Sequence, residues 1–90
     1  MRSQAFTFYC DPGHAWLKVP LALLEDLGLT GKISQYSFRS ARFGYLEEDF
    51  DAYLFIQAWE KRYGGRPEFK TKISNRSSSI RRLARFGGEA

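Results

Sequence analysis

The sequence predicts an α+β domain in which a mainly antiparallel sheet carries two helices on one face. Three observations lead to this prediction: several segments alternate apolar with polar residues, two segments have helical spacing, and strand pairs alternate with single helices. The expected order is strand, strand, helix, strand, strand, helix, strand. The 90 residues suffice for one domain, which we place at residues 1–86, followed by a disordered tail at 87–90.

The first two strands are expected on either side of a tight turn. Apolar residues recur at every second position in 6–10 and again in 15–19, which is the period of a strand. Pro12 and Gly13 suit a type II turn between them, because proline presets φ and glycine accepts a positive φ. The turn brings the single cysteine, Cys10, near the single histidine, His14. We interpret this proximity as a consequence of the hairpin and not as the mark of a site.

A short helix and a second hairpin are predicted next. Pro20 suits the first position of a helix, leucines at 21, 24 and 27 give an apolar stripe, and Gly28 is expected to end the helix. Strand-like segments follow at 32–38 and 43–47, joined by residues 39–42. These two segments should form an antiparallel pair.

A longer helix is predicted from the acidic run at 47–51 to Gly64 and Gly65, where the helix should stop. One face of this helix is apolar and should pack on the sheet; it comprises Ala52, Phe55, Ile56, Trp59 and Tyr63. Phe50 and Leu54 point nearly the opposite way. They are therefore either covered by another part of the chain or form an exposed apolar contact patch.

The C-terminal third predicts a last strand and a short helix. Residues 69–73 alternate, which places Lys70 and Lys72 on one face of the strand. Serines at 77–79 should start a short helix within 76–86, and this helix should bury Ile80 and Leu83.

Positive charge is concentrated toward the C-terminus. The formal net charge is +4, and the segment 66–86 carries seven basic residues with a single acid. Such a segment attracts phosphates or an acidic protein surface, unless it is simply a solvated face. The candidate binding residues are Arg39, Arg42, Lys70, Lys72, Arg76, Arg81, Arg82 and Arg85, with Trp16 and Tyr9 as exposed stacking platforms. Reversal of Arg81 and Arg82 to glutamate is expected to abolish binding with little effect on stability.

Enzymatic chemistry is not expected from this chain. Structural zinc takes four ligands, whereas Cys10, His14 and Asp11 offer at most three. A hairpin tip also lacks the oriented base and the cleft that a cysteine nucleophile needs. The acidic run at 47–51 is interpreted as a solvent-facing helix start and not as a metal or general-acid pair. We therefore expect no cofactor and no metal.

The location of the protein is also expected from the sequence. A single cysteine forms no internal disulfide and suits a reducing compartment. There is no apolar run long enough for a membrane span, and the first residues lack the apolar core of a signal peptide. A cytoplasmic protein without membrane contact is the expectation.

Three motifs together resemble a group of short proteins encoded by bacteriophages and other mobile genetic elements. They are DPGHxWLxVP at 11–20, KISxYS at 32–37 and YLEEDxDA at 45–52, and they span about the first two thirds of the chain. Phe50 stands where a small residue or a cysteine is expected in that group. The resemblance implies a genomic setting, in which small non-enzymatic proteins often interfere with host defence or regulate transcription.

Two functions follow from the charge layout and the resemblance. The first is a non-enzymatic interaction protein that binds and blocks a host defence machine, as an anti-CRISPR-like or anti-restriction inhibitor acting on a host protein or nucleoprotein complex. Mimicry of DNA is disfavoured, since the chain is basic. The alternative is a small basic nucleic-acid-binding accessory or regulatory protein. Neutralising about four to six phosphates would give such a protein a salt slope of about −3.6 to −5.4 on duplex DNA.

Overall fold

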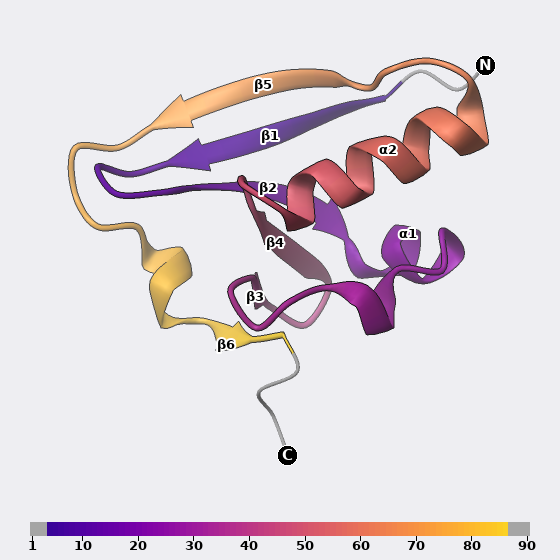
Figure 1. Ribbon diagram of the computed structural model, residues 1–90. Coiled ribbons are helices and arrows are strands. Elements are labelled where there is room, and N and C mark those ends of the chain that lie inside the picture. The colour runs from indigo at the N-terminus through magenta and orange to yellow at the C-terminus, as the bar shows by residue number, and fades with distance from the viewer. Residues whose placement is uncertain (1–3, 87–90) are drawn as a thin grey trace.

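The computed structural model describes residues 4–86, and a six-stranded sheet organises them (Figure 1). The strands are β1 (Ala5–Cys10), β2 (Ala15–Pro20), β3 (Phe38–Arg39), β4 (Phe43–Glu47), β5 (Glu68–Ile73) and β6 (Ala84–Arg85). The helices are α1 (Leu21–Asp26) and α2 (Asp51–Tyr63), with single 3-10 turns η1 (Thr30–Lys32) and η2 (Ser79–Arg82). The tail predicted at 87–90 lies outside the described residues.

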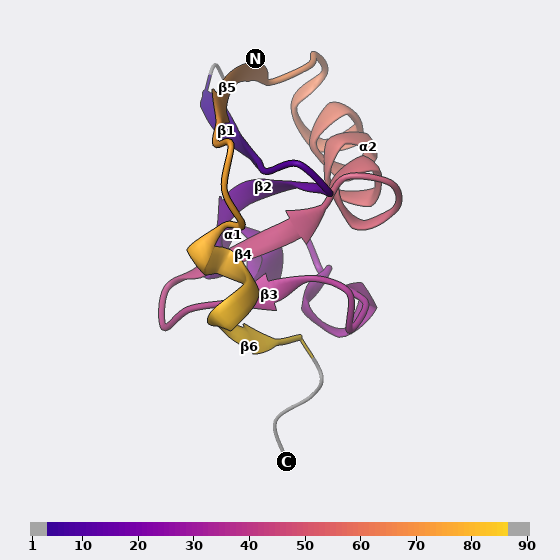
Figure 2. The same ribbon diagram turned by 90° about the vertical axis from the view of Figure 1, so that its left-hand side faces the viewer.

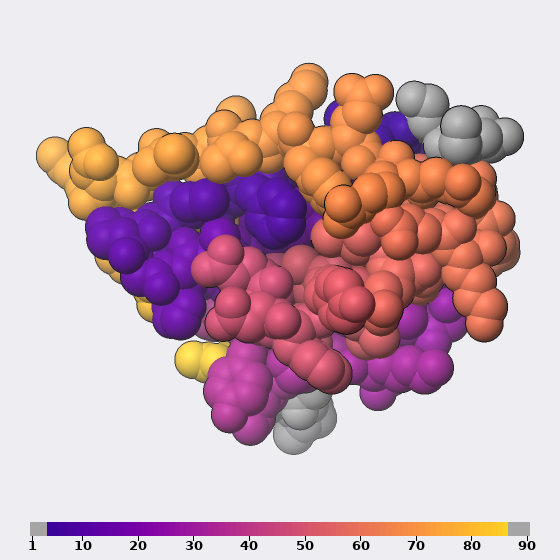
Figure 3. Space-filling view, turned by 45° about the horizontal axis from the view of Figure 1, so that its top comes forward, coloured from indigo at the N-terminus to yellow at the C-terminus, as the bar shows by residue number. Residues whose placement is uncertain are grey.

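The α+β class and the two helices are confirmed, but the sheet is mixed. Its strand order is β5-β1-β2-β4-β3-β6. Four of the strand pairs are antiparallel, whereas β1 and β5 run parallel. The physical reason is that α2 carries the chain from β4 back across the sheet, and parallel neighbours need such a crossover. Figure 3 shows β5 along one margin of the molecule beside β1, and most of its residues are exposed.

Two other predictions are confirmed only in part, both in the segments that form the far edge of the sheet. The strand expected at 32–38 is reduced to the two residues of β3, because Ser34 and Ser37 instead bind the side chain of Asp51. The helix expected at 76–86 is the single turn η2 followed by strand β6. The hydroxyl of Ser78 accepts a hydrogen bond from the Ile80 N–H and so caps this turn.

The first hairpin forms as expected, but by different turn chemistry. Gly13 does not have a positive φ; within residues 4–86 that conformation occurs at Gly28 and Gly64. The Asp11 carboxylate holds the turn instead, because its Oδ1 accepts hydrogen bonds from the N–H groups of Gly13 and His14, both at 3.0 Å. An Asx-type turn of this kind needs no left-handed residue.

Both helices cover the same face of the sheet, which we call the helix face. Its core contains the predicted apolar side of α2 together with residues from β1, β2 and β4, and its buried aromatic members are Trp59, Phe55, Phe6 and Phe86. The ring of Phe6 packs edge to face against those of Phe55 and Trp59, with centroid distances of 5.1 Å and 5.3 Å. Each such pair stabilises the fold by about 0.5–1.5 kcal/mol in addition to the contribution of the buried apolar area.

The opposite face of the sheet, which we call the outer face, is partly covered by the C-terminal segment 74–86. Figure 2 shows this segment on one side of β4 and helix α2 on the other. Ile80 of η2 packs against Trp16 and Phe38 to form a second small core, with Leu83 beside it. The predicted burial of Ile80 is confirmed, and Leu83 is half-buried.

The chain returns to the helix face at Phe86, whose ring lies against Gly44. A Cβ at Gly44 would lie 3.0 Å from Cζ of Phe86 and 3.1 Å from Cδ1 of Leu24. Both neighbours are buried in the core and have little room to move. Gly44 therefore permits the close packing of the C-terminal end on β4.

We expect Gly44→Ala to lower the free energy of unfolding by about 1–3 kcal/mol, because the added methyl overpacks this contact. The measurement is the midpoint of urea unfolding. Gly31→Ala is the control, since a Cβ there meets no atom within 4 Å, and its effect should stay within about 0.5 kcal/mol. A midpoint for the Gly44 variant equal to that of the control would contradict this account of the packing.

Candidate binding surfaces

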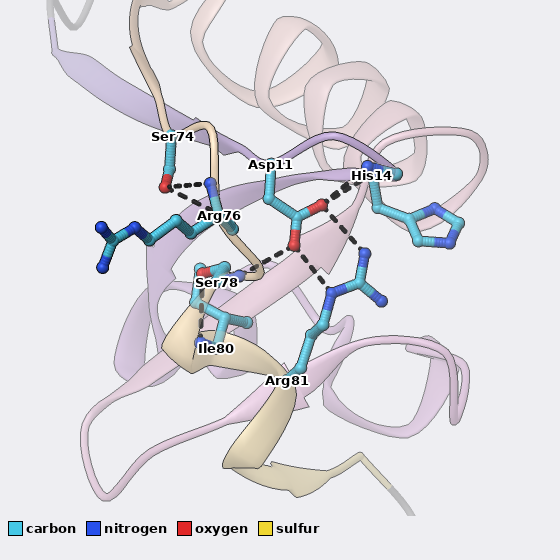
Figure 4. A network of polar contacts seen from close by, with 8 residues as sticks. Asp11, His14, Ser74, Arg76, Ser78, Ile80 and Arg81 are labelled. Atoms are coloured by element: carbon cyan, nitrogen blue, oxygen red, sulfur yellow. Dashed lines mark hydrogen bonds and ion pairs between the residues drawn. The ribbon is translucent and has the colours of Figure 1, made fainter.

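The C-terminal segment is fastened to the first hairpin by an ion pair between Asp11 and Arg81 (Figure 4). Arg81 donates from Nε to Oδ2 at 2.7 Å and from a terminal nitrogen to Oδ1 at 2.9 Å. The N–H of Ser78 donates to the same Oδ2 at 2.9 Å. The Asp11 side chain has no exposed surface, whereas 36% of the Arg81 side chain is exposed. A bidentate pair of this geometry is among the stronger side-chain contacts in proteins.

The ion pair changes the protonation behaviour of Asp11. Its hydrogen bond with Arg81 is the main cause that holds the pKa of the Asp11 carboxyl far below its usual range. The N–H groups of Ser78, Gly13 and His14 lower this pKa further, while burial opposes the shift. In return, the carboxylate raises the pKa of Arg81. Asp11 is therefore ionised throughout the physiological pH range.

Trp16 was predicted to be an exposed stacking platform, and the structure corrects this; Arg81 is exposed in part, but it is held by an ion pair. Trp16 is only 2% exposed, because Ile80 and the rest of the C-terminal segment cover its face of the sheet. It is therefore not a stacking platform. The Arg81 guanidinium lies over the Trp16 ring at 5.1 Å and is committed to Asp11. The pair with Asp11 is a reason to expect that reversal of Arg81 lowers stability, in contrast to the expectation from the sequence for the change of Arg81 and Arg82 to glutamate.

The other predicted basic residues fall into two groups. On the outer face, Lys70 is the strand partner of Thr7, and Lys72 is the partner of Tyr9. Basic residues of the C-terminal segment add to this side: Arg76 before η2, Arg82 in η2 and Arg85 in β6. Arg39 and Arg42 do not join them. The side chain of Arg39 is on the helix face near the Phe86 ring, and Arg42 lies in the turn between β3 and β4.

Lys18 is an outer-face residue that the candidate set omitted. It is the strand partner of Thr7 on one side and of Tyr45 on the other. Its alternation with the buried neighbours Leu17 and Val19 already indicated this orientation. Tyr9 is half-buried, with its ring 6.4 Å from that of Tyr45, and so keeps part of its surface available.

A cleft of about 410 Å³ opens between the C-terminal segment and the end of β4. Its lining residues are His14, Trp16, Tyr36, Phe38, Glu47, Asp49, Arg81 and Arg85. The floor is aromatic, since Trp16 and Phe38 are buried with centroids 6.1 Å apart. Arg85 is held over Phe38 at 4.8 Å and donates to the Gln35 carbonyl at 3.1 Å. Two arginines that are stacked on aromatic rings and anchored thus line one side of the cleft.

The acidic run at 47–51 does not face solvent as a whole, which corrects another prediction. Asp51 is fully buried, and its Oδ2 accepts hydrogen bonds from the N–H and hydroxyl of Ser34 and from the hydroxyl of Ser37. Glu47 caps α2, because its carboxylate accepts from the N–H groups of Asp49, Phe50 and Asp51. Glu48 and Asp49 are exposed, as expected.

The bonds to Asp51 place three exposed aromatic residues around the start of α2. Tyr36, Phe50 and Tyr53 are 66%, 61% and 58% exposed. Tyr36 belongs to the loop that Ser34 and Ser37 attach to Asp51, while Phe50 directly precedes α2 and Tyr53 lies in its first turn. We call these three residues the aromatic rim. The alternative left open for Phe50 is thereby decided in favour of an exposed apolar patch, whereas Leu54 is partly buried.

The structure separates the cysteine and the histidine of the first hairpin. By strand alternation Cys10 lies on the helix face, while the His14 ring lies 6.0 Å from that of Trp16 on the outer face. Among residues 4–86 no group of three or more His, Cys, Asp or Glu side chains is arranged to hold a metal ion. Nor does this part of the chain contain a helix with the length and apolar character needed to cross a membrane.

Comparison of the chain with protein-family models, with curated proteins and with solved structures gives no match. The resemblance to proteins of mobile elements therefore stays a prediction.

The Asp11–Arg81 pair predicts a pH-dependent stability. We expect Asp11→Asn to lower the melting temperature at pH 7 by about 5 °C or more, because the charge opposite Arg81 is lost. The pKa of Asp11 is depressed in the folded state, so the ion pair contributes fully above the unfolded pKa of about 3.9. This contribution is lost as the pH falls from there through the folded pKa, and the difference between wild type and variant should shrink below about pH 4.

Asp26→Asn is the control for this experiment. Asp26 pairs with Arg62 at 3.5 Å, but both side chains are about half exposed, so its removal should change the melting temperature by about 2 °C or less. Equal effects of the two substitutions at pH 7 would show that the Asp11–Arg81 pair does not hold the C-terminal segment.

Proposed function

We propose that this protein acts by binding a partner protein through the cleft and the aromatic rim, and that it catalyses no reaction. The observation that carries the proposal is a cleft with two anchored arginines that is lined by the exposed Tyr36. The exposed Phe50 and Tyr53 follow Asp49, another lining residue, closely in the sequence. Aromatic residues and arginine are the residue types enriched at the centre of protein interfaces. Covering the exposed part of each rim residue would contribute on the order of 2 kcal/mol.

The mixed charge of the cleft favours a protein over a polyanion as its occupant. Arg81 and Arg85 line it, but so do Glu47 and Asp49. The exposed carboxylates at 48 and 49 stand next to the aromatic rim in sequence. A phosphate backbone that crossed this region would meet these negative charges, whereas a protein surface can present both signs in complementary positions.

The size of the surface suits a small inhibitor. A standard interface covers about 800 Å² on each partner, which is roughly a seventh of the 5864 Å² accessible surface of this chain. The cleft and the aromatic rim can therefore form one interface and leave most of the molecule outside it. Because the sequence resembles proteins of mobile elements, which often interfere with host defence, we propose a host defence complex as the partner. The protein would inhibit this complex by steric obstruction.

The test is affinity capture from a lysate of the host cell after nuclease treatment, followed by titration of the captured protein. We expect Phe50→Ala combined with Tyr53→Ala to weaken binding about tenfold or more, because aromatic anchors of an interface are lost. The melting temperature should change by no more than about 2 °C, since both side chains are exposed.

Ile73→Ala provides the matched control, because Ile73 is a large hydrophobic residue that is 79% exposed but lies at the end of β5. Its removal should leave the captured complex unchanged. Equal losses in the two variants, or a complex that disappears on nuclease treatment, would overturn the proposed protein-binding surface.

A further inference from the structure

The part of the outer face that carries Lys70 and Lys72 of β5, Thr7 and Tyr9 of β1 and Lys18 of β2 does not line the cleft of the proposed protein-binding surface. Strand register places Lys70, Thr7 and Lys18 in one row across three neighbouring strands. In the next row Lys72 stands beside Tyr9. Neighbouring strands are about 4.8 Å apart, so these three ammonium groups are concentrated on one small area of the sheet.

Aromatic rings accompany the lysines on this area. The Lys18 ammonium lies 4.2 Å from the centroid of Phe43, and the Lys72 ammonium lies 5.9 Å from that of Tyr9. Tyr9, Lys18 and Phe43 also line a shallow depression of about 260 Å³, together with Gln4, Ala5, Phe6, Thr7 and Pro20. Positive charge and partly accessible aromatic surface thus alternate along the face.

Carboxylates are nearly absent from the same area. Among the outer-face positions of β1, β2 and β5, the acidic residue is Glu68, the first residue of β5. The carboxylate of Asp11, at the opposite end of β1, is buried under Arg81. Arg76 and Arg82 extend the positive charge onto the adjoining C-terminal segment. The area is therefore complementary to phosphate groups.

We infer that the outer face over β5, β1 and β2, which carries Lys18, Lys70 and Lys72, binds single-stranded nucleic acid. We call this area the lysine face. A sheet face of this kind offers a flat track on which unpaired bases stack on aromatic rings while lysines meet the phosphates. Duplex readout instead requires a helix or a β-ribbon that enters a groove, and the outer face of these strands presents neither. Stacking contributes about 1–3 kcal/mol per base and depends little on sequence, so binding should be non-specific.

The inference is tested by fluorescence anisotropy with a labelled oligothymidylate, and with a duplex of matched length, at about 50 and 200 mM salt. The test variant is Lys70→Glu combined with Lys72→Glu. We expect it to weaken binding of the single strand about tenfold or more at low salt, and to reduce the magnitude of the salt slope by about 1.4, since two phosphate contacts are lost.

The control variant is Lys32→Glu combined with Lys61→Glu. These lysines are exposed on η1 and α2, and both variants change the net charge from +4 to 0. The control should bind within about threefold of wild type, because its charges lie away from the lysine face. Thermal melts of both variants would establish that they are folded.

Four results would overturn the inference: no binding of the single strand by wild type at low salt, tighter binding of the duplex, equal losses in the two variants, or equally effective competition by polyglutamate. The last result would identify an acidic protein surface as the occupant. The oligonucleotide assay contains no partner protein, so its outcome is independent of the proposed interface at the cleft.

Discussion

The buried ion pair between Asp11 and Arg81 connects the beginning of the chain to its end, and the form of the outer face depends on it. Without this pair, η2 would have the small contact of Ile80 with Trp16 and Phe38 and few other attachments to the sheet. With it, the C-terminal segment covers Trp16, directs Arg85 onto Phe38 and forms one side of the cleft. A single carboxylate also holds the tip of the first hairpin, so the turn and the segment it binds are fixed together.

A second buried carboxylate plays a comparable part at the start of α2. Asp51 binds the serines of the loop at 34–37, and this replaces the strand that the segment would otherwise form. The hydroxyl of Ser37 also accepts a hydrogen bond from the N–H of Glu47. The backbone carbonyl of Ser37 accepts one from the N–H of Phe86. These bonds fix the loop that carries Tyr36 against the start of α2, beside which Phe50 and Tyr53 lie. Rigid polar support beneath exposed aromatic side chains is a favourable arrangement for binding, since less conformational freedom is lost on association.

Local periodicity was sufficient for the elements whose partners are adjacent in sequence. The first hairpin, β4, the apolar side of α2 and the faces of Lys70 and Lys72 follow from spacings of two and of three to four residues. What could not be predicted depends on distant partners. Arg81 has the appearance of a free surface arginine until Asp11, 70 positions away, is placed beside it. The burial of Trp16 and the parallel direction of β5 likewise depend on how the chain returns to the sheet, which alternation does not encode.

The two proposed binding surfaces adjoin each other, and this bears on the kind of target that we propose. The C-terminal segment lies on the same face of the sheet as the lysines and also lines the cleft. A few lysines give only modest and salt-sensitive affinity for a single strand. If the partner protein itself holds nucleic acid, contact at the cleft raises the effective concentration of that strand at the lysine face, and the two modest affinities reinforce each other without any new contact. If both proposed surfaces bind as we infer, a nucleoprotein complex engages them together, whereas free nucleic acid or a protein alone engages one of them.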